Sequence, residues 1–231
     1  MQRRRFLMSS GGLLAGAALG LSSPARAKGL TQAEYAANDA LGLAKLMRGG
    51  AVSPLEVLEA AVSRAEAINP AINAVVLKHY DLSRAALAQG KPSGPFGGVP
   101  MLLKDLGISF KSTITSNGSV FFRDAVADHD STLVDRYRRA GLNIFGKTAS
   151  PEFGQTATTE SRLWGMTRNP WSLEHSAGGS SGGAAAAERL GQLDTGHPRG
   201  GGGSSRTSPA PRRPFGPQPN PGGGERRRAP A

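Results

Sequence analysis

Three residues of this chain have the type and surroundings that nucleophilic chemistry requires. Lys104 ends an apolar run, Ser180 lies in a Gly-Gly-Ser-Ser-Gly-Gly run, and Ser204 follows a row of glycines. A serine hydroxyl attacks a carbonyl carbon efficiently only when a base removes its proton. The oxyanion that then develops needs hydrogen-bond donors, which glycine-rich backbone can supply. The three residues could therefore act as base, proton carrier and nucleophile.

The lysine lies where a buried strand is expected. Residues 99–103 form a short apolar run bounded by glycine and proline, which is typical of a strand inside a sheet. A lysine at the end of such a strand loses solvation, which favours its neutral form and lets it act as a base. The alternative is that Lys104 and the following Asp105 form an ordinary surface ion pair.

The serine run has two interpretations. Glycines on both sides of Ser180 and Ser181 let the backbone adopt unusual dihedral angles and let a substrate approach closely. A flexible Gly/Ser linker is the alternative, and the run by itself would favour it. The alanines at 184–187 suit a buried helix, however, so we interpret the run as an ordered part of a site.

These segments together resemble the amidase signature family, hydrolases of C–N bonds that use a Ser–Ser–Lys triad. The resemblance runs from about residue 30 to about residue 187. Six segments carry it, namely Gly98-Val-Pro with Lys104-Asp105, Thr115-Ser-Asn-Gly118-Ser119, Phe145-Gly-Lys-Thr148, Pro151-Glu-Phe153, Arg168-Asn-Pro-Trp171 and the run 178–183. Residues 145–153 are interpreted as packing and loop-shaping residues.

The resemblance implies a role for each candidate. Lys104 would be the base, and Ser180, held by a cis peptide bond, would pass protons between Lys104 and the nucleophile. Ser204 would be that nucleophile, and Ser181 is expected to contact the substrate. The amides of Gly201, Gly202 and Gly203 would form the oxyanion hole. The substrate class is a small-molecule carboxylic amide, and no cofactor or metal is expected.

The match at Ser204 is incomplete. Arg206 follows it as in the family, but Arg199 and Gly200 replace the Thr-Asp pair that the family has before the glycines. A serine in a low-complexity tail is the alternative.

The four histidines show no metal-ligand spacing, and the absence of cysteine excludes a cysteine nucleophile.

The first residues resemble a targeting signal. Arginines at 3–5 precede Phe6-Leu7, an apolar run over 13–21 and the Ala-Arg-Ala sequence at 25–27. Charged, apolar and small-residue regions in this order predict an export signal that is cleaved after Ala27. Paired arginines before Phe-Leu resemble a twin-arginine signal, which implies the twin-arginine export machinery as a partner and a periplasmic or secreted protein. A membrane anchor is the alternative, but the run is short and rich in glycine.

The remaining sequence predicts an α/β fold. Two capping boxes predict helices over residues 31–47 and 53–69, the second ended by Asn69-Pro70. We also expect two helices and two strands, over residues 81–90 and 131–140 (capped by Asp130), and over 99–103 and 142–145. Their alternation favours a largely buried sheet. The resemblance implies the amidase signature fold, a mixed-sheet core covered by helices, which is incomplete here.

Composition divides the chain into three parts. Of the net charge of +11, residues 1–26 contribute +4 and the residues after Glu188 contribute +6, which leaves +1 for the body. A nearly neutral body argues against nucleic acid as its partner. Residues 188–231 are rich in Gly, Pro, Arg and Ser and cannot bury enough apolar surface to order themselves. We therefore expect an export signal over 1–27, the N-terminal part of an amidase domain over 28–187, and a disordered or out-of-frame basic tail.

The abrupt change after residue 187 suggests a reading-frame shift between about residues 187 and 200, because GC-rich DNA yields Gly, Pro, Arg and Ala in any frame. A natural basic tail and an evolved truncation are the alternatives.

The leading function is amide hydrolysis through a serine acyl-enzyme, with this chain as a fragment. The second hypothesis is an inactive fragment or a secreted non-catalytic binding protein with a basic tail. The third hypothesis is the glutaminase-type subunit of a tRNA amidotransferase, and the export signal argues against it.

Overall fold

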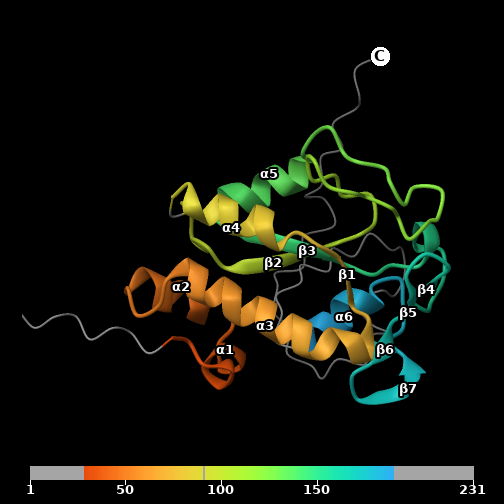
Figure 1. Ribbon diagram of the computed structural model, residues 1–231, viewed down its shortest axis with the longest axis horizontal. Coiled ribbons are helices and arrows are strands. Elements are labelled where there is room, and N and C mark those ends of the chain that lie inside the picture. The colour runs from red at the N-terminus through yellow and green to blue at the C-terminus, as the bar shows by residue number, and fades with distance from the viewer. Residues whose placement is uncertain (1–28, 91, 190–231) are drawn as a thin grey trace, which may run out of the picture.

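A three-stranded mixed sheet lies at the centre of the molecule (Figure 1). The computed structural model describes residues 29–90 and 92–189, so the predicted export signal, the tail, Gly201 to Gly203 and Ser204 lie outside the described residues. The strand order is β1 (Val75–Lys78), β3 (Asn143–Thr148), β2 (Pro100–Lys104). β2 runs parallel to β3 and β1 runs antiparallel to it. The predicted α/β fold with a mixed, buried sheet is confirmed.

Helices cover both faces of this sheet. α3 (Pro54–Ile72) and α6 (Gly182–Arg189) lie on one side, and α5 (Thr132–Arg139) lies on the other (Figure 1). Leu102 and Phe145 pack with the first group, whereas Met101 and Leu103 pack with Val134 of α5. β2 is therefore buried on both faces, which is why its sequence is a continuous apolar run rather than an alternating one.

The helix predicted over residues 31–47 is two helices, so that prediction was wrong in its continuity. α1 (Gln32–Ala37) begins with the predicted Thr31–Glu34 capping box, and α2 (Ala40–Arg48) follows after a break. At the break Asn38 is extended, and the Asp39 carboxylate accepts a hydrogen bond from the Gly42 amide at 2.8 Å. A second N-cap residue inside the apparent helix starts a new one.

The expected end of α3 at Asn69-Pro70 was also wrong. The helix begins with the predicted Ser53–Glu56 capping box but continues to Ile72 and ends at Asn73, whose φ of 52° is left-handed. Pro70 lies in the last turn, and the helix continues past it although the proline nitrogen has no hydrogen to donate to the carbonyl of residue 66. The Asn69 side chain then accepts from the amides at 74 and 75 and leads the chain into β1, a strand that the sequence analysis did not predict.

The remaining elements carry the chain around the sheet. α4 (Tyr80–Ala88) contacts β3 and α3, close to its predicted range. Ser131, rather than the predicted Asp130, caps α5, because Asp130 is engaged with the Lys111 amide and with Arg138. The 3-10 turn η1 (Glu152–Gly154) and four short strands lead to α6. The strands are β4 (Glu160–Ser161), β5 (Gly165–Met166), β6 (Arg168–Asn169) and β7 (Ser172–Ser176).

Over residues 29–90 and 92–189 no helix is long and apolar enough to cross a membrane.

Candidate active site

The structure brings Lys104 and the serine run together. The Lys104 Nζ donates to Ser180 Oγ at 3.0 Å and to Ser181 Oγ at 2.9 Å. Lys104 is 1% exposed and each serine is 7% exposed. Lys104 is therefore not part of a surface ion pair, and the serine run is not a flexible linker. The fold brings the two together although they are far apart in sequence. A buried amine between two hydroxyl groups can exchange protons with them.

Lys104 and the two serines are positioned by different elements. Lys104 is the last residue of β2, and both serines lie immediately before α6. The peptide bond between Gly179 and Ser180 is cis, as the family resemblance implied. The positive end of the α6 dipole faces the hydroxyl groups, which disfavours additional positive charge on the nearby amine.

Close backbone packing explains why glycines follow the serines. A Cβ on Gly183 would collide with the backbone of Ala149, the residue after β3. The Thr159 hydroxyl donates to the Gly178 carbonyl at 2.7 Å and accepts from the Gly182 amide at 3.0 Å. The serine run is thus held on both sides, and the start of α6 lies directly against the sheet.

Asp105 anchors the strand end that carries the lysine. Its side chain is fully buried and accepts from the amide of Ser116 at 2.9 Å, from the Ser116 hydroxyl, and from the Trp164 indole at 3.2 Å. Its own amide donates to the Thr148 carbonyl at 3.0 Å. Asp105 therefore ties β2, β3 and the segment that follows β2 together at the site.

Lys147, one residue before the end of β3, is a second buried lysine. Its Nζ donates to the carbonyls of Ile114 at 2.6 Å and Ile108 at 3.3 Å, and to the Thr115 hydroxyl at 2.7 Å. Burial lowers the pKa of Lys147 to about 8, and the Asp105 carboxylate opposes that shift. Because its partners are oxygen acceptors, the ammonium form satisfies them best.

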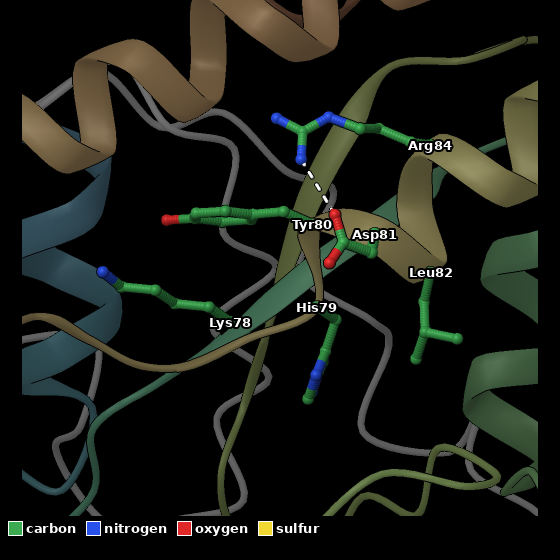
Figure 2. Close-up of a pocket in the computed structure, with 6 residues that line it drawn as sticks. All are labelled: Lys78, His79, Tyr80, Asp81, Leu82 and Arg84. Atoms are coloured by element: carbon green, nitrogen blue, oxygen red, sulfur yellow. Dashed lines mark hydrogen bonds and ion pairs between the residues drawn. The ribbon is translucent and has the colours of Figure 1, made fainter.

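An open hollow of about 480 Å³ lies elsewhere, beside β1 and the start of α4 (Figure 2). Its basic groups are engaged with acidic neighbours, since Arg84 is paired with Asp81 and Glu59, and Lys78 with Glu66. Its lining residues are Lys78, His79, Tyr80, Asp81, Leu82 and Arg84. The hydroxyl among them is the phenol of Tyr80, which donates to the Glu66 carboxylate at 2.6 Å, and no serine, threonine or thiol lines the hollow. The serine and lysine cluster is therefore the better candidate for a reactive site.

Among the described residues no cluster of His, Asp or Glu could hold a metal ion. Within that part of the chain, the site consists of lysine, hydroxyl groups and backbone. Ser204, Gly201, Gly202 and Gly203 lie outside the described residues, so their predicted roles stay predictions.

Comparison with known proteins decides the family. The chain matches the family described as Amidase over residues 56–211. It belongs to this amidase family. It is 44% identical over 151 residues to the 6-aminohexanoate-cyclic-dimer hydrolase of Paenarthrobacter ureafaciens, a match that covers 64% of this chain and 30% of that protein. It is 40% identical to a lipoamidase of Enterococcus faecalis, over 68% of this chain and 22% of that protein.

The fold is shared as well. A solved 6-aminohexanoate cyclic dimer hydrolase superimposes with a TM-score of 0.65 and 42% identity, covering 68% of this chain and 32% of that structure. The chain thus spans about a third or less of the length of these relatives. Membership of the family, predicted from the motifs, is confirmed.

Several residues that hold the lysine and serine cluster in place were not predicted. Asp105 was noted only as a neighbour of Lys104, and Lys147 only as part of a packing segment. Ser116 was noted only within the loop segment 115–119. Thr159 and Trp164 had no signal, because each acts through a contact with a residue distant in sequence. Such pairings follow from the folded arrangement and leave no spacing pattern in one sequence.

Proposed function

We propose that this chain is the N-terminal part of the catalytic domain of an amide hydrolase. One observation carries the proposal, namely that the Lys104 amine lies within hydrogen-bond distance of both Ser180 and Ser181 in a buried site. Relatives that hydrolyse amides support the substrate class. The substrate would be a small carboxylic amide.

In the proposed reaction of the intact protein, a nucleophilic serine attacks the amide carbonyl carbon; Ser204 is that serine if the reading frame is unbroken, and otherwise the serine of the restored Gly-Gly-Ser-x-Arg segment takes its place. Its proton passes to Ser180 as Ser180 gives its own proton to the neutral Lys104 amine. The amides of the glycines before that serine, which are Gly201 to Gly203 if it is Ser204, would stabilise the oxyanion. The C–N bond then breaks, the leaving nitrogen takes the proton back through Ser180, and water releases the acid from the acyl-enzyme.

The same proposal includes where the protein works and why this chain is short. Its first 27 residues would direct export by the twin-arginine route to the periplasm or beyond. A frame shift after about residue 187 would have replaced the rest of the domain, including the true nucleophile segment. The 231-residue chain would then be inactive, although the intact protein is an amidase.

A fluorophosphonate probe, which reacts with activated serines, tests this proposal. The 231-residue chain should remain unlabelled, whereas a protein re-coded in the frame that restores a Gly-Gly-Ser-x-Arg segment should be labelled. Changing Lys104→Met in the re-coded protein should reduce labelling by about a hundredfold or more, as loss of a general base does.

The controls separate the parts of the proposal. If the 231-residue chain is labelled and Ser204→Ala abolishes the label, Ser204 is the nucleophile and the frame shift is wrong. If no frame restores the segment and the chain neither reacts with the probe nor hydrolyses amides, the non-catalytic binding protein takes its place. Labelling that persists in Lys104→Met would contradict the role of the lysine.

A further inference from the structure

The serine run lies against the residues that lead into β4. A Cβ on Gly179 would lie 2.7 Å from the backbone of Thr158, and a Cβ on Gly182 would collide with the Thr159 hydroxyl. Because these positions are glycines, the run can approach this backbone closely. Thr159 is fully buried at the contact, and the proposed reaction gives it no part.

The Thr159 hydroxyl joins the two ends of the run. It donates to the carbonyl of Gly178 at 2.7 Å and accepts from the amide of Gly182 at 3.0 Å. A hydroxyl has one hydrogen and two lone pairs, so one group can make both bonds at the same time. The Gly182 amide is the first of α6, and the first amides of a helix have no acceptor inside it. A single side chain thus closes the arc of backbone that carries Ser180 and Ser181.

Thr159 is itself fixed by a second buried threonine, Thr167. The Thr159 carbonyl accepts from the Thr167 amide at 2.8 Å, and the Thr167 hydroxyl donates to the carbonyl of Asn73, the C-cap of α3, at 2.8 Å. The Thr167 carbonyl accepts from the amide of Ala177, directly before the run, at 3.1 Å. β-branched side chains have few χ1 rotamers, which keeps both hydroxyls in place. Hydrogen bonds therefore connect the end of α3 to the serine run.

We propose that Thr159 is a positioning residue that holds the Ser180 and Ser181 hydroxyls on the Lys104 amine. Without the Thr159 hydroxyl, the carbonyl and the amide at the two ends of the arc would each lose a buried partner, and the arc would shift to regain one. The serine contacts of Lys104 are 3.0 and 2.9 Å long, so a displacement of about 1 Å would take both hydroxyls beyond hydrogen-bond distance. This inference rests on the proposed function of Lys104 and Ser180.

The NMR signal of Lys104 tests the inference without turnover. In the full chain, labelled with 13C at the lysine ε-carbon, this signal is identified by its loss in Lys104→Met. Ser180→Ala removes one hydroxyl from the amine and sets the direction in which the signal moves when that contact is lost. Thr159→Val, which replaces the hydroxyl by a methyl group, should move the signal in the same direction. Thr159→Ser, which keeps the hydroxyl, should move it less.

Kinetics of the re-coded protein test the consequence for the reaction. Thr159→Val should lower kcat for a simple amide by about tenfold or more and leave KM nearly unchanged, because a misplaced proton carrier slows the chemical step rather than binding. Thr159→Ser should restore most of kcat. Thr156→Val is the matched control, since it removes an exposed hydroxyl that donates to the Thr158 carbonyl within the same loop. It should leave the Lys104 signal and kcat unchanged.

Urea unfolding shows which variants are folded. If Thr159→Val does not fold, Thr159→Cys takes its place, because a thiol is a weaker donor and acceptor, and it should move the Lys104 signal in the direction of Ser180→Ala. An unchanged Lys104 signal or an unchanged kcat in the folded variant overturns the inference, and so does a Thr159→Ser variant as impaired as Thr159→Val. Absence of hydrolysis by the re-coded wild type would count against the proposed function, whereas the Lys104 signal still decides the role of Thr159.

Discussion

At the scale of single residues, the two buried lysines differ in what surrounds their amines. The partners of Lys104 include two hydroxyl groups, which can both accept and donate, so a neutral amine remains compatible with them. Two of the partners of Lys147 are carbonyls, which require a donor. Equal burial thus permits proton exchange at Lys104 and favours a lasting ammonium at Lys147.

His79 supplies a prediction on stability against pH. Burial, with a smaller contribution from the charge of Lys147, lowers the pKa of His79 from 6.5 to about 4. Between these values the unfolded chain binds more protons than the folded protein, so the free energy of unfolding should fall as the pH falls from 6.5 to 4. The expected loss is on the order of 2 kcal/mol.

Urea unfolding at several pH values measures this loss. The His79→Phe variant should lose less stability over the same range, because it has no ring to protonate. His175 is exposed, so His175→Gln should retain the wild-type slope. A wild-type slope in His79→Phe would show that other groups cause the acid sensitivity.

At the scale of elements, the start of α6 depends on the absence of side chains. Gly183→Ala would place a Cβ against the backbone of Ala149, which cannot move without disturbing the end of β3. We expect the free energy of unfolding to fall by about 1–3 kcal/mol. Gly29→Ala, at a position with no atom within 4 Å of the added Cβ, is the control and should change it little. Equal stability of the two variants in urea would contradict the close packing of α6.

The sequence predicted the elements that local signals define. The capping boxes at Thr31 and Ser53 and the apolar run of β2 were correct, because each depends on neighbouring residues. The break at Asn38 and the continuation past Pro70 were missed, since in both cases an asparagine side chain takes over backbone hydrogen bonds. β1 was missed because it is a short strand whose pairing with β3 is settled only in the fold.

The candidate site was predictable to the same degree. Lys104 and Ser180 stood out because their motifs are local, and the fold places them together as the resemblance implied. The residues that hold them in place were not predictable, since Thr159 and Asp105 form hydrogen bonds with residues outside their own sequence motifs. One sequence reveals the reactive groups, whereas their support requires the three-dimensional arrangement.

At the scale of the whole molecule, charge is concentrated at the ends of the chain. The body carries only +1 of the +11, whereas eight arginines follow Glu188. We therefore expect binding of the full chain to duplex DNA to be independent of base sequence and to weaken steeply between 50 and 200 mM salt, on the order of tenfold or more. A variant with these eight arginines changed to glutamine should lose most of this binding in a fluorescence anisotropy titration.

The counterpart of this variant changes the surface arginines of α5, at 136, 138 and 139, to glutamine. It alters the folded body and should bind DNA nearly as the wild type does, because the arginines after Glu188, rather than one helix, carry most of the net positive charge. If the α5 variant loses DNA binding and the tail variant keeps it, the body has a basic face of its own. The nucleic-acid class of function would then have to be reopened beside amide hydrolysis.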